Sequence, residues 1–395
     1  MAQAKYYKIG FLTVLRASAF SKKIKVVKII DYLLGIILQP FIFKKPYSKG
    51  SMEHIKDVKN ILVIRPGGIG DAVLVLQFIN KLNNIFSNPK IDVLCEKRNF
   101  EIFIFQEGIN HIFLFDRLSD ILKLIFIKEY DVVFDTEQWH NTSAILTYFL
   151  KTKISIGFDT RPLRKKAYRY SVEYVQDMYE MLNFLNLLSP LNIVDNKMLY
   201  APFNFTFTIK KDTQEWAFKK IPHHNTVALF LKGSIKERCI DNEVILELAN
   251  FLIKKGFFIL LVGGKELIAE HGGISSSIID KDRIFDFTGK TTLNETAALI
   301  KNCILYIGSD TGLTHLAYVL GIPTIAIFGP GNEKKWSPPV NWVNKYISIN
   351  LHKHNNRICT IFGYIIPPKK NETCFKEINV DNICALIEKF LLNIL

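Results

Sequence analysis

The chain has 395 residues, a length that suggests two domains. Hydrophobic residues make up 49% of it and charged residues 22%, which excludes a disordered, collagen-like or low-complexity chain. The six cysteines include no pair at C-x-x-C spacing, so the sequence indicates neither a disulfide scaffold, a zinc site nor a redox dithiol. We therefore expect a protein of a reducing compartment.

The formal net charge of +14 is concentrated near the N-terminus. Residues 1–58 contain eleven Lys or Arg and three acidic residues, a net charge of +8, so only +6 belongs to the other 337 residues. Basic charge beside apolar sequence favours anionic lipid headgroups or phosphorylated ligands as partners over nucleic acid.

Residues 22–43 are expected to form a basic amphipathic helix, part of an N-terminal extension over residues 1–58. Apolar residues from Val26 to Leu38 recur at helical spacing, and lysines flank both ends. The most apolar part, residues 29–43, would reach about 22 Å as a helix, short of a bilayer core of about 30 Å. No small-residue cleavage site follows it, so a signal peptide fits poorly. We expect this helix to attach to a membrane surface; the alternative is that its apolar stripe packs on the folded body.

From residue 60 onward, short β-rich runs alternate with helical patterns. Strands are expected at residues 61–65, 91–95, 111–115, 131–135 and 153–157, with helices at 71–84 and 175–188 among others. A Pro- and Asn-rich stretch at 189–225 marks a boundary region. This alternation predicts a parallel sheet with helices on both faces.

The same pattern restarts after the boundary. Strands are expected at 226–231, 257–262, 304–308 and 323–328, with helices at 241–255, 293–302 and 313–320. We therefore predict an α/β fold with two doubly wound domains, residues 59–205 and 206–395, the second ending in a C-terminal helix. Ligands of such sheets bind at the carboxyl ends of the strands, which predicts a site in a cleft between the two halves.

The first motif, Arg65-Pro-Gly-Gly-Ile-Gly-Asp71, joins a strand to a helix. Its glycines, including Gly68, let a ligand approach the backbone, and Asp71 suits a general base. The alternative is that Asp71 only caps its helix. A dinucleotide site is a further interpretation, because Glu96 follows the second strand, but Val73 stands in place of the third glycine of G-x-G-x-x-G.

The second motif, residues 310–315 (DTGLTH), also follows a strand and opens a helix. The backbone amides of Thr311, Gly312 and Leu313 would favour an anion such as a diphosphate. Asp310 is placed to bind sugar hydroxyls and His315 to donate to a phosphate oxygen. The alternative is an aspartate cap followed by a half-buried histidine.

Two basic segments are candidates for binding phosphate. Ser234 and Lys236 lie in a loop after the first strand of the second half, and Arg161 and Arg164 belong to a basic cluster that suits an anionic acceptor. Both segments are equally consistent with solvated surface charge. No Walker A, G-x-S-x-G or H-E-x-x-H pattern and no paired-aspartate cation motif occurs, so no metal site is expected.

Taken together, these motifs resemble glycosyltransferase family 9, the bacterial heptosyltransferases of lipopolysaccharide synthesis. The resemblance lies in ILVIRPGGIGD at 61–71, FTGKTTLNE at 287–295, IGSDTGLTH at 307–315, residues 321–330 and the late cysteine segment 374–378. The similarity runs in the family's order and leaves the first 58 residues outside. The sequence departs from the family in Val75-Leu76-Gln77, where Thr-x-Pro is usual, and in residues 236–240.

The resemblance implies two Rossmann-like domains facing a cleft, the GT-B arrangement. It also implies a metal-independent, inverting transfer of heptose from ADP-heptose, a substrate rather than a cofactor, to a lipid-linked phosphorylated saccharide. The enzyme would work as a peripheral protein at the cytoplasmic face of the inner membrane. The first domain would bind the acceptor, through Gly68, Arg161 and Arg164, and the second the donor.

The family's residue roles carry over to matching positions. Asp71 would deprotonate the acceptor hydroxyl, and Ser234 and Lys236 would stabilise the departing phosphate. The donor-binding residues would be Gly289, Lys290 and Thr291 near the nucleoside, Thr311, Gly312 and Leu313 at the diphosphate, and Asp310 and His315 at the sugar and phosphate. An NAD-dependent oxidoreductase and a catalytically inactive glycan-binding protein of the same fold are the alternative functions.

Overall fold

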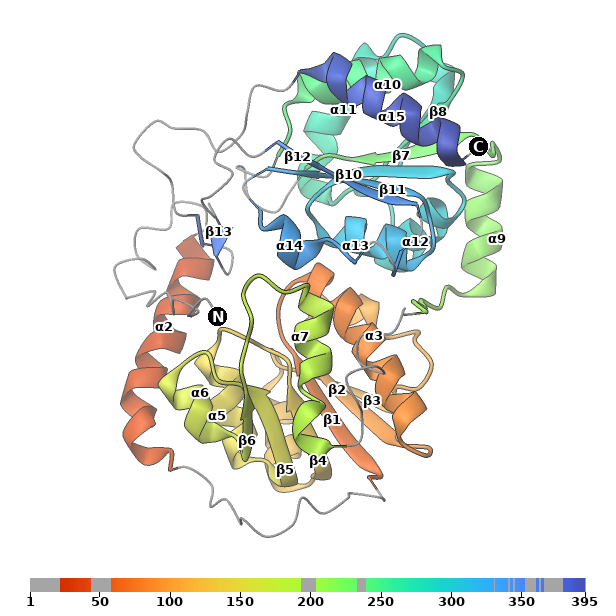
Figure 1. Cartoon of the computed structure of the whole chain (residues 1–395). Coiled ribbons are helices and arrows are strands. Elements are labelled where there is room, and N and C mark those ends of the chain that lie inside the picture. Colours follow the sequence, from red (N-terminus) through yellow and green to blue (C-terminus); the bar gives the residue numbers. More distant parts are fainter. Residues whose placement is uncertain are drawn as a thin grey trace. The chain divides into compact units, whose positions relative to one another are not determined.

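The computed structural model describes residues 22–43, 58–192, 204–232, 239–329, 331–339, 342–343, 345–351, 360–361, 364–365 and 379–394. The chain divides into two compact units, Met1–Pro202 and Phe203–Leu395, which we call unit 1 and unit 2. Each is an α/β body (Figure 1). Within the described ranges, no helix combines the length and the apolar character needed to cross a bilayer.

Unit 1 is built on a sheet of six parallel strands in the order β3-β2-β1-β4-β5-β6. Their bounds are β1 (Asn60–Arg65), β2 (Lys90–Cys95), β3 (His111–Leu114), β4 (Glu129–Asp135), β5 (Lys151–Phe158) and β6 (Tyr170–Val172). The central strand β1 is buried along residues 61–65, as expected for a parallel strand covered on both faces.

Helices cover this sheet. They are α3 (Ile69–Ile85), α4 (Leu118–Phe126), α5 (Asn141–Phe149), α6 (Pro162–Ala167) and α7 (Glu180–Asn186), with short 3-10 turns η2 (Phe100–Ile102) and η3 (Ser189–Leu191). The N-terminal helix α2 (Lys22–Leu38) continues into η1 (Gln39–Phe41) and lies along α5 (Figure 1). On the opposite side of the unit, α3 packs against α7.

Unit 2 repeats the design with the order β12-β11-β10-β7-β8-β9, again all parallel. The strands are β7 (Thr226–Phe230), β8 (Phe258–Leu261), β9 (Ile284–Asp286), β10 (Leu305–Ser309), β11 (Thr324–Phe328) and β12 (Tyr346–Asn350). The helices are α9 (Lys211–Lys220), α10 (Asn242–Lys254), α11 (Ile268–Ser277), α12 (Leu293–Lys301), α13 (Gly312–Val319), α14 (Glu333–Trp336) and α15 (Val380–Ile394). The described elements also include two short 3-10 turns and two short strands: η5 (Lys265–Leu267), η6 (Lys281–Arg283), β13 (Thr360–Ile361) and β14 (Tyr364–Ile365).

Both sheets have the Rossmann strand order, in which the first three strands extend the sheet to one side and the next three extend it to the other side of the first strand. The reversal lies between β1 and β4 in unit 1 and between β7 and β10 in unit 2. The predicted fold of two doubly wound domains is therefore confirmed. In each unit, the loops that follow these two strands are the place where this fold binds ligands.

Some predicted elements differ from the structure. The helix expected at 175–188 is shorter, because the side chain of Asn183 bonds both the N–H and the C=O of Val175 and holds that residue in a loop. Helix α9 lies in the expected boundary region, and β6, α11, β9 and β12 were not predicted. The ring of Phe205 contacts Tyr318 and Trp342, so this residue packs with unit 2.

Candidate functional site

The unit 1 site lies where β1 and β4 end side by side. Ile64 of β1 pairs with Asp135 of β4, so the loops after these strands, residues 66–68 and 136–140, leave the sheet as neighbours. The first loop leads into α3 and the second into α5. The carboxyl ends of both strands therefore bring two polar segments, about 70 residues apart in sequence, to the switch point of the sheet.

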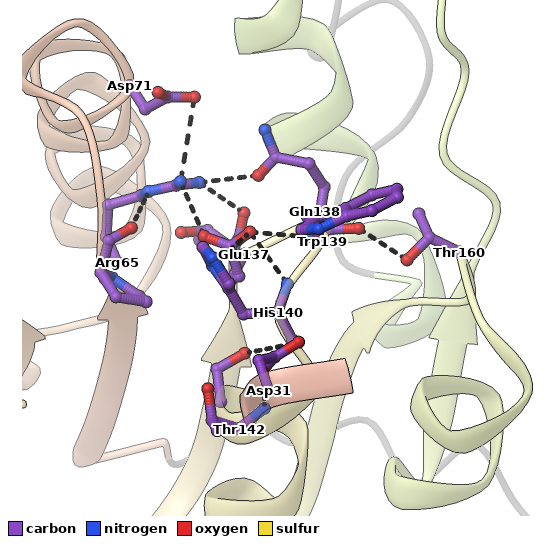
Figure 2. A network of polar contacts seen from close by, with 12 residues as sticks. Asp31, Arg65, Asp71, Glu137, Gln138, Trp139, His140, Thr142 and Thr160 are labelled. Carbon is purple, nitrogen blue, oxygen red and sulfur yellow. Dashed lines mark hydrogen bonds and ion pairs between the residues drawn. The ribbon is translucent and has the colours of Figure 1, made fainter. Parts of the chain in front are cut away.

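A buried Arg65–Glu137 pair forms the base of this site. The Arg65 guanidinium donates to Glu137 Oε2 at 2.9 Å, to the carbonyl of Thr136 at 2.9 Å and to Gln138 Oε1 at 3.0 Å (Figure 2). Burial alone would raise the pKa of Glu137, but the charges of Arg65 and His140 more than offset it and hold this pKa well below its usual range. Both partners are 3% exposed, so the pair is a fixed, ionised element.

Asp71 is the third residue of α3 and points toward this pair. Its Oδ1 lies 3.9 Å from Nη2 of Arg65 (Figure 2), and the side chain is 18% exposed. Oδ1 is buried and accepts no hydrogen bond from the described residues. The helix cap is Gly68, which has no side chain to cap with, so the interpretation of Asp71 as a cap is wrong.

Asp120 shows what an aspartate at the same helix position does in a structural role. It is the third residue of α4, is 16% exposed and lies 3.8 Å from Nη1 of Arg117, so it matches Asp71 in position, exposure and ion pairing. Its Oδ2, however, accepts the backbone N–H of Leu114 at 2.9 Å. Asp71 makes no such bond, which leaves a carboxylate oxygen able to accept a proton from a ligand.

The glycines of the first loop leave room for these side chains. Gly67 has a φ of +118°, and a Cβ there would lie 3.1 Å from Nη2 of Arg65. A Cβ on Gly68 would lie 3.1 Å from Oδ2 of Asp71. The glycine-rich turn therefore leaves space for the arginine and the aspartate, and the close ligand approach that the sequence predicts stays a prediction.

The second loop places an aromatic ring and a histidine beside the Arg65–Glu137 pair. The guanidinium of Arg161 stacks 3.9 Å above the Trp139 ring, and the carbonyl of Gln138 accepts the Thr160 hydroxyl at 2.6 Å. His140 Nδ1 lies 3.4 Å from Oε1 of Glu137. This loop was missed by the sequence analysis; the signal is a run of Glu-Gln-Trp-His directly after a buried strand.

The two predicted acceptor arginines differ sharply. Arg161 is 14% exposed beside the site. Arg164 is fully buried: it pairs with Asp135, donates to Ser143 Oγ at 3.1 Å and bonds the carbonyls of Glu137 and His140. Its prediction as an acceptor contact is therefore wrong, because its guanidinium is enclosed by the unit's own groups.

The unit 2 site lies at the corresponding strand ends, those of β7 and β10. Asp310 follows β10 and is 5% exposed, and Thr311 is the cap residue of α13. A Cβ on Gly331 would lie 2.4 Å from Oδ2 of Asp310, so a side chain at this position would have to displace the carboxylate. The hydroxyl of Ser309 is buried without a hydrogen bond among the described residues. The amides of Gly312 and Leu313 begin the helix here, as predicted.

Other residues singled out in unit 2 are held by their neighbours. His315 is 4% exposed, with Nδ1 2.8 Å from the Tyr318 hydroxyl, a largely enclosed position. The N–H of Gly289, at a φ of +69°, donates to the carbonyl of Gly263 at 2.9 Å. Lys290 Nζ donates to the carbonyl of Asp286 at 2.7 Å, which turns this lysine back on its own strand.

A further lysine, not assigned a role from the sequence, lies at the end of β7. Lys232 is 5% exposed and pairs with Glu270 of α11 at 2.8 Å. Thr291 bonds Thr296 at 2.8 Å and so braces the start of α12. Ser234 and Lys236 lie outside the described residues. Over the part of the chain that is described, no group of three or more His, Cys, Asp or Glu side chains is arranged to hold a metal ion.

Two Rossmann-like units, each with polar groups at its switch point, are the domain composition of GT-B glycosyltransferases. Residues 121–363 match the model of glycosyltransferase family 9 (heptosyltransferase), and the chain belongs to this family. It is therefore a glycosyltransferase. This assignment decides between the enzyme classes that the glycine-rich turn left open, and the oxidoreductase interpretation is wrong.

Relatives and solved structures agree with this assignment. Lipopolysaccharide heptosyltransferase 3 of Escherichia coli K12 is 25% identical over 342 residues, 82% of this chain and 95% of the relative. A family 9 glycosyltransferase from Veillonella parvula has a TM-score of 0.71 at 17% identity, covering 87% of this chain and all of that one. The E. coli ADP-heptose lipopolysaccharide heptosyltransferase II has a TM-score of 0.66, also at 17% identity, covering 85% and 99% of the two chains.

Proposed function

We propose that this protein transfers a heptose from ADP-heptose to a phosphorylated saccharide of a lipopolysaccharide core. Family membership supports the reaction class, and the printed names of a relative and of a solved structure, lipopolysaccharide heptosyltransferase 3 and ADP-heptose lipopolysaccharide heptosyltransferase II, support the donor and the acceptor class. The observation that carries the proposal is Asp71, a carboxylate at a switch point with a buried oxygen that accepts no hydrogen bond from the described residues.

Asp71 is the proposed general base. As the acceptor oxygen attacks the anomeric carbon, Oδ1 of Asp71 takes its proton, the new C–O bond forms, and the bond to the diphosphate breaks with its electron pair leaving on ADP. Attack from the side opposite the leaving group inverts the anomeric centre. The first turn of α3 and the Arg65 guanidinium, 3.9 Å away, place positive charge beside this carboxylate.

Groups of unit 2 are proposed to stabilise the departing ADP without a metal. Negative charge builds on the leaving oxygen, and fixed donors lower the energy of that state. The position of the N-terminal amides of α13, at Thr311, Gly312 and Leu313, supports this proposal, because they lie at the switch point of unit 2. Asp310 lies beside them and is proposed to orient the sugar. Ser234 and Lys236 are proposed to bind the phosphates, and residues 289–291 to contact the nucleoside.

The acceptor side is proposed to use Arg161 and the backbone at Gly68. Arg161 brings a cation to the rim of the unit 1 site, stacked on Trp139, and a cation there suits a phosphorylated saccharide. Gly68 begins α3 next to Asp71, so a hydroxyl that approaches this turn is within reach of the base.

The test is direct assay of donor and acceptor. The purified full chain is incubated with ADP-heptose and heptose-deficient lipopolysaccharide core acceptors, and ADP release and product mass are measured. Parallel reactions contain GDP-mannose, UDP-glucose or ADP-heptose with EDTA. We expect ADP-heptose alone to give a product one heptose heavier, with EDTA having no effect. Turnover of another nucleotide sugar, or loss of turnover in EDTA, would overturn the proposed donor or the proposed metal independence.

A further inference from the structure

Helix α2 packs on unit 1 through a face that includes polar and small residues. Gly35 is buried against α5 so closely that a Cβ there would lie 2.2 Å from Nδ2 of Asn141. Asp31, one turn earlier on the same face, is 4% exposed. Lys28, a further turn back, is half-buried. The residues at 28, 31 and 35 therefore share the inward face, and all three are polar or small.

Asp31 fixes the helix in this orientation. Its Oδ1 accepts the N–H of Thr142, the second residue of α5, at 2.9 Å (Figure 2). The cap residue of α5, His140, provides no side-chain cap, so Asp31 supplies from another helix the carboxylate that the positive end of α5 favours. Its Oδ2 also lies 3.8 Å from Nη1 of Arg161.

An apolar stripe of α2 points away from unit 1. Four side chains at helical spacing form a stripe that is about half exposed: Val26 53%, Ile30 50%, Leu33 45% and Ile37 60%. The stripe is extended through η1 by three further exposed apolar side chains, whose exposed fractions are 53% for Ile36, 69% for Phe41 and 70% for Phe43. A surface helix ordinarily buries its apolar stripe and exposes its polar one.

Other apolar residues do pack on unit 1: Leu34 and Leu38 are half-buried, and Ile42 is 2% exposed in a cluster with Ala144 and Leu163. The alternative that the helix packs on the folded body is therefore confirmed in part. The exposed stripe calls for an external apolar partner.

The charge around the stripe identifies the partner. Residues 1–58 carry a net +8, with Lys22, Lys23 and Lys25 before the stripe and Lys44 and Lys45 after it. Asp31, the only acidic residue between 22 and 43, faces inward. An anionic bilayer offers apolar chains beneath negative headgroups, which complements an apolar stripe flanked by cations. A second copy of this chain would bring the same positive charge and be repelled.

We propose that α2 and η1 lie in the surface of an anionic lipid bilayer, with the stripe among the acyl chains and Asp31 fastening the helix to unit 1. The inward face of α2 contacts Arg161, so the proposed acceptor residue lies directly behind the lipid-facing helix. A lipid-linked acceptor would then be presented from the same bilayer. This last step rests on the proposed function, whereas lipid binding does not.

Vesicle flotation of the full chain, without donor or acceptor, tests lipid binding alone. The vesicles contain phosphatidylethanolamine with phosphatidylglycerol, or phosphatidylcholine only. The test variant is Ile30→Asp/Ile37→Asp. The matched control is Phe218→Asp/Ile279→Asp, two exposed apolar residues of unit 2 at 52% and 56%. Thermal unfolding of each variant verifies that it folds.

We expect the wild type and the control to float with the anionic vesicles and to bind neutral ones much less. The test variant should lose at least about tenfold in partitioning, because two apolar side chains are replaced by charges. Equal binding by the test variant overturns the proposal. Loss of vesicle binding in Leu118→Asp, a residue of α4 that is 71% exposed, also overturns the proposal. A wild type that forms a stable dimer but binds no vesicles, with the test variant monomeric, overturns it as well.

Discussion

Replacing Asp71 by asparagine tests the proposed chemistry at one atom. The substitution keeps the side chain's shape and removes its ability to take a proton. The lost ion pair is 3.9 Å long and partly exposed, so the expected change in the free energy of unfolding is below about 1 kcal/mol. Arg65 keeps its 2.9 Å bond to Glu137, so the base of the site is retained.

The expected kinetic effect is far larger than the structural one. Removal of a general base lowers kcat by about 10²- to 10⁴-fold, or about 3–5 kcal/mol in the activation free energy. The assay is ADP release at saturating donor and acceptor, with donor affinity measured separately by calorimetry. Donor affinity should stay within about threefold, because the substitution removes a group that acts only as the proton moves.

Asp120→Asn is the matched control for this experiment. It changes the same helix position, at 16% rather than 18% exposure and with an arginine at 3.8 rather than 3.9 Å. It should leave kcat within about twofold of the wild type while lowering stability, because the Leu114 N–H then faces a neutral acceptor. Asp71 is not the general base if Asp71→Asn keeps more than a tenth of wild-type kcat, or if Asp120→Asn loses as much activity.

Three further outcomes are expected from the described contacts. Gly331→Ala should weaken ADP-heptose binding at least about tenfold in calorimetry, because its Cβ would displace Asp310, whereas Gly272→Ala, which meets no neighbour, should not. Asp31→Ala should lower the free energy of unfolding by about 1–2 kcal/mol in denaturant titrations, through the lost cap on α5. Burial lowers the pKa of Lys28 from 10.5 to about 8, so between these pH values the unfolded chain binds more protons. Stability of the wild type should therefore rise relative to Lys28→Met from pH 8 to pH 10; a constant difference would contradict this.

Most of the fold could be predicted from the local pattern of apolar residues in the sequence. The buried runs at 61–65 and 305–309 are typical of a doubly wound sheet in each half, because parallel strands covered on both faces are apolar throughout. The alternation of such runs with helical patterns predicted both sheets. Helix 175–188 was overestimated because its first turn competes with bonds from Asn183, a tertiary feature that helical spacing does not record.

The site was only partly accessible from the sequence. Asp71 could be identified because it follows a glycine-rich turn. Glu137 could not, because its role depends on the ion pair with Arg65, which lies 72 positions earlier. Arg164 looks like one more surface cation until Asp135 and Ser143, from two other elements, enclose it. The helical spacing of apolar residues in α2 predicted an apolar and a polar side. It did not predict which side packs on unit 1, because the contact of Asp31 with the start of α5 joins residues more than 100 positions apart.

The cap that Asp31 places on α5 affects the expected activity of shortened forms of the enzyme that lack α2. A version starting at residue 59 would expose the first amides of α5 to water and deprive Arg161 of its carboxylate neighbour. Both changes fall beside Trp139, at the rim of the proposed acceptor site. Poor turnover by such a shortened enzyme would therefore report damage to unit 1 itself, even in an assay with a fully water-soluble acceptor.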